Sequence, residues 1–243
     1  FVVRQIGVPI FIVPDLEVVG FMPPEHTYEV ASWNRNEGDN PLEWIYDYLD
    51  LPEDGSQVSV AIGTQMWACN TVDIINHVLD VTDDEGSART NVKWRNAGPL
   101  MNPLRRTKSP SEITKLEAVA AAIDRVFDRL QNGGISMFGR TEQEVARDIR
   151  VAMIAEGHEA IEFVIVAHGP NGSNPHHQPG DTVIGEGLVL IDIGGPMDGA
   201  QSDCTRCFYF GIPPAEVMNA YSVLMEAQQA AFEAAKPGTP TIE

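Results

Sequence analysis

Two aspartates on either side of a turn signal are the residues of this chain most suited to chemistry. Asp192 ends the apolar run LVLID, and Asp203 lies in the segment SDCTRCFYF that follows it. Between them stand glycines, a proline and the dipeptide Asp198-Gly199, a combination typical of a tight β-hairpin. We therefore expect the two carboxylates to lie on neighbouring antiparallel strands, beside a core.

The register of this hairpin decides how close the two carboxylates come. A turn centred near Met197 and Asp198 pairs Asp192 directly with Asp203 on one face of the sheet. Direct cross-strand partners have Cβ atoms about 4.5–5.5 Å apart. A β-bulge at one of the turn glycines would shift this pairing by one residue.

Two like charges placed opposite one another destabilise a sheet, and a neighbouring core adds a desolvation cost. A bound cation reverses this cost because it supplies compensating charge. Carboxylate oxygens suit Mg²⁺, Mn²⁺ and similar cations, and a pair of them can hold two ions about 3.5–4 Å apart. The alternative is a pair of hairpin carboxylates that point into solvent, and the residues alone leave both interpretations open.

Helix-start signals and changes in the spacing of apolar residues predict the helices and strands around the hairpin. Ser109 with Glu112, and Thr141 with Glu144, each form the pattern of a capping box at the start of an apolar-periodic helix. After Gly157 the pattern changes to strands, with the runs FVIVA, LVLID and CFYFG. A last helix is predicted from about residue 215 to residue 235, where Pro and Gly end it.

The first hundred residues have a different organisation, a β/α alternation poor in clustered catalytic residue types. The expected elements are strands at 11–19 and 58–63 and helices at 40–50 and 64–80. We place a domain boundary near residue 105, which divides the chain into 1–104 and 105–243. The chain opens on the strand-like run FVVRQIGVPIFIV, so we expect its natural start to be missing.

Composition argues against several classes of partner. The 243 residues carry 16 basic and 35 acidic side chains, for a net charge of −19. Such a surface disfavours nucleic acid, whose phosphate backbone requires a basic face, although it suits the collection of divalent cations. No apolar run approaches the roughly 20 residues of a membrane helix, so we expect no membrane partner.

The three cysteines, an odd and low number, argue against a disulfide scaffold and for a reducing, cytoplasmic location. Cys204 and Cys207 form a C-x-x-C within an expected strand, whereas redox motifs of this spacing begin a helix. Neither a second C-x-x-C nor a nearby histidine completes a zinc site. We expect both to be ordinary strand residues.

Residues 166–211 resemble the core of the pita-bread metallopeptidases, which include Xaa-Pro dipeptidase (prolidase), aminopeptidase P and methionine aminopeptidase. The matching features are Pro175-His176, a strand ending in Asp192, and the segment SDCTR at residues 202–206. The resemblance implies an α/β N-terminal domain like that of prolidases, followed by an α+β pita-bread catalytic domain that is incomplete at its C-terminus.

The resemblance also implies a site for two divalent metal ions with five ligands. Asp192 would bind one ion and Asp203 would bridge both, while a histidine and two glutamates would complete the site from beyond Glu243. Mn²⁺ is the first choice of metal, with Co²⁺ or Zn²⁺ as alternatives. The chain is therefore expected to be a segment of a longer protein.

His176 matches the family histidine that contacts the substrate near the scissile bond without binding metal. Its spacing to Asp192 is one residue shorter than usual, so His177 competes for the role. Strand parity puts Thr205 on the same face as Asp203, suited to a hydrogen bond that supports a metal ligand. A β-branched residue simply favoured in a strand is the alternative for Thr205.

Other polar residues of the chain carry less weight. His168 and Asn171 belong to the same loop as the family histidine and are weaker candidates for approaching a substrate. His26, His77 and His158 have no evident chemical partner in the sequence, and we expect them to be structural.

The implied function is metal-dependent hydrolysis of short peptides with proline after the scissile bond, by a dipeptidase or an aminopeptidase that forms a homodimer. Two alternatives are another hydrolase on the same fold and a non-catalytic pita-bread module that binds proteins. Creatinase-like hydrolases and binding modules need not retain the aspartates. The presence of Asp192 and Asp203 therefore favours the peptidase.

Overall fold

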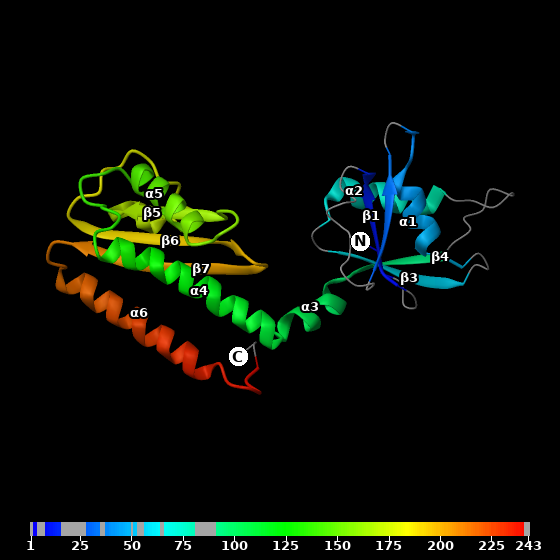
Figure 1. The fold of residues 1–243 in the computed structure, drawn as a ribbon. Coiled ribbons are helices and arrows are strands. Elements are labelled where there is room, and N and C mark those ends of the chain that lie inside the picture. Colours follow the sequence, from blue (N-terminus) through cyan, green and yellow to red (C-terminus); the bar gives the residue numbers. More distant parts are fainter. Residues whose placement is uncertain are drawn as a thin grey trace. The chain divides into compact units, whose positions relative to one another are not determined.

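The computed structural model describes residues 2–3, 8–15, 28–34, 37–49, 51–52, 56–63, 66–80 and 91–240. The chain divides into two compact units, Phe1–Thr107 and Lys108–Glu243. Figure 1 shows strands and helices in both of them. Because each unit has its own packing, each is described by itself below.

The described strands of the first unit form two parallel pairs: β1 (Ile10–Pro14) with β2 (Glu29–Trp33), and β3 (Gln57–Ile62) with β4 (Asn91–Asn96). Its helices are α1 (Pro41–Leu49), α2 (Ala68–Asp80) and α3 (Gly98–Arg106). Parallel strands require a crossover connection, and α2 lies between β3 and β4 in the chain. The expected helix at 40–50 and strand at 58–63 are confirmed, whereas α3 was not predicted.

The second unit carries the two aspartates on a three-stranded antiparallel sheet of order β5-β6-β7. Its strands are β5 (Phe163–His168), β6 (Gly187–Met197) and β7 (Ala200–Phe210). Its helices are α4 (Pro110–Gln131), α5 (Glu142–Ala155), α6 (Ala215–Ala234) and the short 3₁₀ helix η3 (Gly169–Ser173). The predicted order of two helices, three strands and a last helix is confirmed.

Both predicted capping boxes are present at the starts of α4 and α5. In α4 the Ser109 hydroxyl accepts from the Glu112 N–H, and the Glu112 carboxylate accepts from the Ser109 N–H. Thr141 and Glu144 make the same reciprocal pair in α5. An N-cap hydrogen bond of this kind is worth about 0.5–2 kcal/mol, so local sequence sets where each helix begins.

Alternation along the strands separates a core face of the sheet from an open face. Val164 and Val166 of β5 and Ile191 and Ile193 of β6 pack with α4 and α5 in one apolar cluster. Asp192 lies between two of these core residues, so its side chain points to the opposite face. An apolar run can therefore carry a carboxylate without burying it among apolar side chains.

The register of the β6–β7 hairpin differs from the predicted one. Asp198 and Gly199, with φ of 49° and 76°, form the two-residue turn between Met197 and Ala200. Asp192 therefore pairs with Thr205, and the expected direct pairing of Asp192 with Asp203 is wrong. The cause is a turn centred one residue later than predicted, which moves every pairing by two residues and leaves each side chain on its face.

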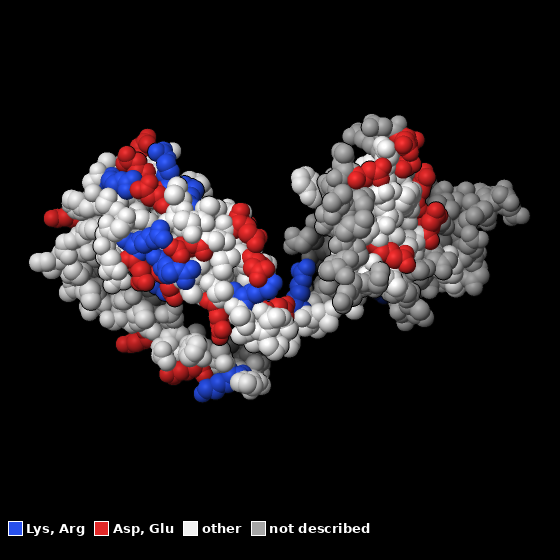
Figure 2. Space-filling model, in the orientation of Figure 1, with Lys and Arg blue, Asp and Glu red and all other residues white. Residues whose placement is uncertain are grey.

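Basic and acidic side chains lie close together on the surface of the second unit. Figure 2 shows Lys and Arg side chains lying among Asp and Glu side chains on the face in view. Arg125 Nε donates to Glu156 Oε2 at 2.5 Å, and Arg129 pairs with the same carboxylate. These pairs join α4 to the C-terminal end of α5. Among the described residues, no helix is both long enough and apolar enough to cross a membrane.

Gly194 allows β6 to pass beneath an aromatic ring on the open face. A Cβ at this position would lie 2.7 Å from two ring carbons of Phe163 and 2.4 Å from the Ser202 carbonyl oxygen. Real Cβ atoms do not approach other atoms so closely, and the carbonyl belongs to the backbone of the adjacent strand. The sheet therefore has no room for a side chain between Phe163 and Asp203, which is the cross-strand partner of Gly194.

We predict that Gly194→Ala lowers the free energy of unfolding by about 1–3 kcal/mol, as overpacking does in well-packed proteins. The measurement is the urea unfolding midpoint of the variant and of wild type. Gly185→Ala is the matched control, because a Cβ there would meet nothing within 4 Å. Equal midpoints for both variants would contradict this account of Gly194.

Candidate metal centre

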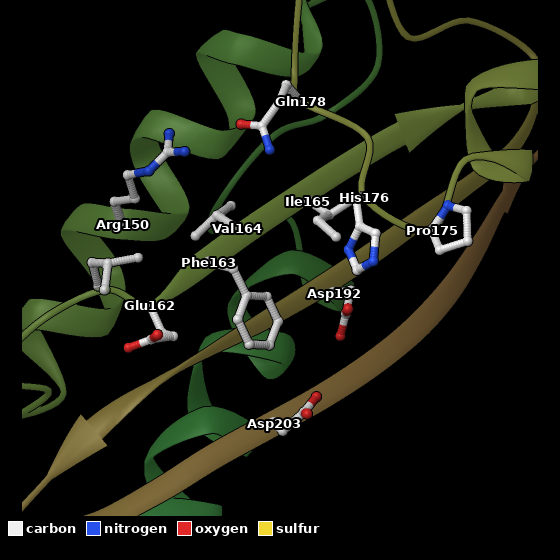
Figure 3. A pocket seen from close by; sticks show the side chains of 11 residues that line it. Arg150, Glu162, Phe163, Val164, Ile165, Pro175, His176, Gln178, Asp192 and Asp203 are labelled. Atoms are coloured by element: carbon white, nitrogen blue, oxygen red, sulfur yellow. The ribbon is translucent and has the colours of Figure 1, made fainter. Parts of the chain in front are cut away.

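A pocket of about 490 Å³ lies on the open face of the sheet in the second unit. Asp192 and Asp203 line it from β6 and β7, and His176 lines it from the loop after η3. Figure 3 shows the two carboxylates and the imidazole around the same hollow, with the Phe163 ring beside them. The structure therefore brings together three of the residues that the sequence singled out.

Asp192 and Asp203 are diagonal neighbours rather than direct partners. Asp203 is opposite Gly194, and Asp192 is opposite Thr205. Diagonal positions of an antiparallel pair are about 7–8 Å apart, which relieves the repulsion expected of directly opposed charges. Both carboxylates would still be available to hold a cation between them.

Thr205 supports Asp192. Its Oγ1 donates to Asp192 Oδ1 at 2.7 Å across the two strands. Thr205 lies on the carboxylate face, as its position in the strand predicted. Its hydrogen bond goes to Asp192 and not to Asp203. A hydroxyl that donates to one carboxylate oxygen orients the group and leaves the other oxygen for a ligand.

Neither aspartate forms an ion pair in the part of the chain that the structure describes. The nearby Arg206 donates instead to the Thr205 carbonyl, lies 3.8 Å from Asp124 and covers the Phe127 ring. Two carboxylates facing one pocket suit a hard divalent cation. The described residues include no group of three His, Cys, Asp or Glu side chains able to hold a metal. Asp192 and Asp203 therefore fit such an ion only as part of a larger set of ligands.

The two adjacent histidines point to different places. His176 lines the pocket, whereas His177 Nε2 lies 2.7 Å from Glu142 Oε2, away from the aspartates. A carboxylate can only accept, so His177 Nε2 carries the hydrogen in this contact. Of the two candidates that spacing left open, the structure brings His176 to the aspartate pair.

Glu142 holds the loop of His176, and the sequence did not predict this role. Its side chain is fully buried and accepts four hydrogen bonds, from His168 N, Asn171 Nδ2, His177 Nε2 and Gly180 N at 2.8, 2.8, 2.7 and 3.2 Å. Burial acts to raise the pKa of Glu142, but the hydrogen bonds, led by that from Asn171, outweigh it and hold the pKa below its ordinary value.

Two of these partners had been weaker candidates for substrate contact. His168 and Asn171 both bind Glu142, and His168 Nδ1 also lies 3.1 Å from the Leu188 carbonyl oxygen. Both residues therefore organise the loop and do not line the pocket. The capping box at Thr141 and Glu144 accounted for the start of this helix, so nothing local in the sequence marked the glutamate between them.

Further lining residues come from positions that carried no chemical signal. Phe163 of β5 lies on the open face because Val164 and Val166 face the core and side chains alternate along a strand. Arg150 of α5 and Gln178 reach the pocket from the side opposite the aspartates (Figure 3). Their positions depend on how α5 and the loop pack on the sheet, so spacing could not reveal them.

His158 is structural, as expected. Its Nε2 lies 3.0 Å from Ser202 Oγ and its Nδ1 lies 3.1 Å from the Met153 carbonyl oxygen, inside the core. Ser202 Oγ also bonds both the N–H and the carbonyl of Gly195. This cluster fixes the strand directly before Asp203. His77 lies on α2, and His26 falls outside the described residues.

Cys204 and Cys207 both lie on β7, which confirms their prediction as strand residues. Their positions differ by three, so the thiols point to opposite faces of the sheet. Burial raises the pKa of both thiols, which lowers their reactivity. The C-x-x-C spacing therefore has neither the geometry nor the acidity of a redox pair.

Comparison with known proteins places this architecture in a class. Metallopeptidase family M24 matches residues 114–243, which include both strands of the hairpin and the loop of His176. The chain belongs to this family. The resemblance to the pita-bread metallopeptidases drawn from the sequence motifs is thereby confirmed.

Particular relatives are dipeptidases and prolidases by name. The probable dipeptidase PepE of Mycobacterium tuberculosis is 36% identical over 237 residues, covering 96% of this chain and 58% of that protein. The Xaa-Pro dipeptidase of Lactobacillus helveticus is 40% identical over 214 residues, covering 81% and 55%. The chain thus spans little more than half the length of these curated relatives.

Solved structures show the same fold over most of the chain. The dipeptidase PepE from Mycobacterium ulcerans has a TM-score of 0.72 at 32% identity, covering 93% of this chain and 57% of that one. The prolidase from Thermococcus sibiricus has a TM-score of 0.75 at 28% identity, with the same coverage.

The stability that Glu142 contributes is expected to depend on pH. Because folding lowers its pKa, the contribution is complete above the ordinary value of 4.5 and is lost as the pH falls through the folded pKa. The difference in unfolding free energy between wild type and Glu142→Gln should be widest at neutral pH and should shrink in acid. Glu117→Gln, at an exposed position of α4, is the control. A difference that stays constant throughout would contradict the prediction.

Proposed function

We propose that this protein is a metal-dependent peptidase that hydrolyses short peptides with proline after the scissile bond, as an Xaa-Pro dipeptidase or Xaa-Pro aminopeptidase. The observation that carries the proposal is the shared pocket of Asp192, Asp203 and His176. Membership of metallopeptidase family M24 supports it, and so do relatives named as dipeptidase and Xaa-Pro dipeptidase.

Each residue of the pocket has a proposed role. Asp192 and Asp203 would hold divalent ions, with Thr205 orienting the Asp192 carboxylate. Bound ions would lower the pKa of a water and polarise the scissile carbonyl. His176 would hold the substrate carbonyl and stabilise the charge that develops on its oxygen, since an imidazole N–H can donate to it.

The remaining ligands, a histidine and two glutamates, are expected from outside residues 1–243. The curated relatives are longer than this chain and leave room for them. Mn²⁺ is the proposed metal, with Co²⁺ or Zn²⁺ as alternatives. A homodimer and a cytoplasmic location also stay predictions.

Two other functions compete with this one. A non-catalytic pita-bread module would bind a protein partner, and another hydrolase of the same fold would not require metal. Neither has a reason to keep two carboxylates in one pocket where, among the described residues, no ion pair neutralises them. The discriminating observation is metal-dependent cleavage of an Xaa-Pro dipeptide by the intact gene product.

We predict that Asp203→Asn in the intact protein reduces kcat/KM for an Xaa-Pro dipeptide to below about 1% of wild type, because a neutral amide would replace a carboxylate proposed to hold the metal ions. Asp198→Asn is the matched control: it makes the same change at the exposed hairpin turn, where Asn also tolerates the left-handed backbone. Wild-type activity in Asp203→Asn would refute the assignment.

We predict that the Thr205 hydroxyl strengthens metal binding, which can be measured by removing the metal and titrating it back. Protein stripped with a chelator is expected to lose activity and to recover it as Mn²⁺ is titrated back. Thr205→Val removes the hydroxyl at nearly constant volume and should weaken Mn²⁺ binding about 10–100-fold. Thr205→Ser keeps the hydroxyl and should bind as wild type does. Calorimetric titration measures all three, and equal affinities would show that the hydrogen bond to Asp192 does not support the site.

A further inference from the structure

The loop that carries His176 is held by one buried carboxylate. This loop, residues 168–180 and here called the histidine loop, runs from the end of β5 through η3 to Gly180. Glu142, the first residue of α5, contacts it at its beginning, middle and end through four hydrogen bonds. The side chain is fully buried although it is charged.

Each carboxylate oxygen of Glu142 accepts two of these bonds. Oε1 takes those of His168 N and Asn171 Nδ2, and Oε2 takes those of His177 Nε2 and Gly180 N. Every donor is an uncharged N–H, or an imidazole N–H, from the histidine loop. Isolated burial of a carboxylate costs several kcal/mol, and four donors compensate that cost. The carboxylate and the loop conformation therefore stabilise each other.

Glu142 is itself held by a rigid element. Its N–H donates to the Thr182 carbonyl at 3.0 Å, and the Gln143 N–H donates to the Gly180 carbonyl at 3.0 Å. The N-terminus of α5 also favours a negative charge at this position. The start of the helix thus provides a fixed point, to which both the carboxylate and the far end of the loop are attached.

The contact with His177 is the one that bears on the pocket. His177 and His176 are adjacent, and the backbone between them couples their orientations. His177 turns toward Glu142, and His176 lines the pocket with Asp192 and Asp203. Release of His177 would remove the restraint that keeps the neighbouring imidazole at the pocket.

We infer that Glu142 is a positioning residue for the proposed peptidase: it holds His177 and the histidine loop so that His176 faces the aspartate pair. The inference rests on the proposed function for its effect on catalysis, but not for its effect on the loop. Glu142 touches no substrate, and it acts through the residues that it binds.

The same turn of α5 offers a matched control. Glu144 completes the capping box with Thr141, and its side chain makes no hydrogen bond or ion pair with the histidine loop. Glu144→Gln removes a negative charge that favours the start of the helix, whereas Glu142→Gln replaces an acceptor by an NH₂ group that faces N–H donors. A residue important only for helix stability would give the same result in both variants.

The test uses the intact gene product with Mn²⁺, an Xaa-Pro dipeptide and amide hydrogen exchange. Glu142→Gln should lower kcat about 100-fold, the size of effect that a small misplacement of a catalytic group produces, and should change KM less. Exchange at the His168 and Gly180 amides should accelerate in this variant. Glu144→Gln should leave both kcat and these amides as in wild type.

A second pair of variants keeps the test decisive where Glu142→Gln folds poorly. His177→Ala removes the donor to Glu142 and should also lower kcat. His177→Gln restores an N–H near the position of Nε2 and should recover most of the activity. If His177 served only to stabilise the fold, His177→Gln and His177→Ala of equal thermal stability would have equal activity.

The outcomes separate the inference from the proposed function. Wild-type protein that cleaves no peptide would defeat the proposed function, while the exchange data would still decide whether Glu142 holds the loop. Unchanged exchange at His168 and Gly180 in Glu142→Gln would overturn the inference. Active wild type with equal kcat in Glu142→Gln and Glu144→Gln would overturn it as well.

Discussion

The alternation of side chains along β6 is the constraint on which the second unit depends. One face of this strand supplies Ile191 and Ile193 to the core, and the other presents Asp192 to the pocket. The helices α4 and α5 cover the apolar face, so the carboxylates are left on the face that they do not cover. The packing that stabilises the sheet therefore also determines the face on which a cation could be bound.

In the second unit, local signals in the sequence were sufficient for the long helices, the strands and the face of each aspartate. Capping boxes at Ser109 and Thr141 predicted the starts of two helices, because their hydrogen bonds span only three residues. The register failed by two residues because a slip of two leaves the apolar pattern unchanged. The turn at Asp198 and Gly199 sets the register, and its centre is ambiguous in a segment with several turn-forming residues.

The contacts that the sequence did not reveal are those between distant segments. Glu142 binds residues 26 to 38 positions away, and its helix-start location already had an ordinary explanation. The choice between His176 and His177 likewise depends on this contact and not on spacing. Family resemblance identified the two aspartates and the histidine, but the interaction that orients the loop required the folded chain.

The cluster of His158, Ser202 and Gly195 has a consequence for how the hairpin closes. A β7 strand paired two residues out of step would present the same apolar side chains to α4 and α5, so core burial alone rejects it weakly. It would, however, move the Ser202 hydroxyl away from Gly195 and bring the two aspartates face to face. The hydrogen bonds of the buried imidazole and its serine thus stabilise the observed register over one shifted by two residues.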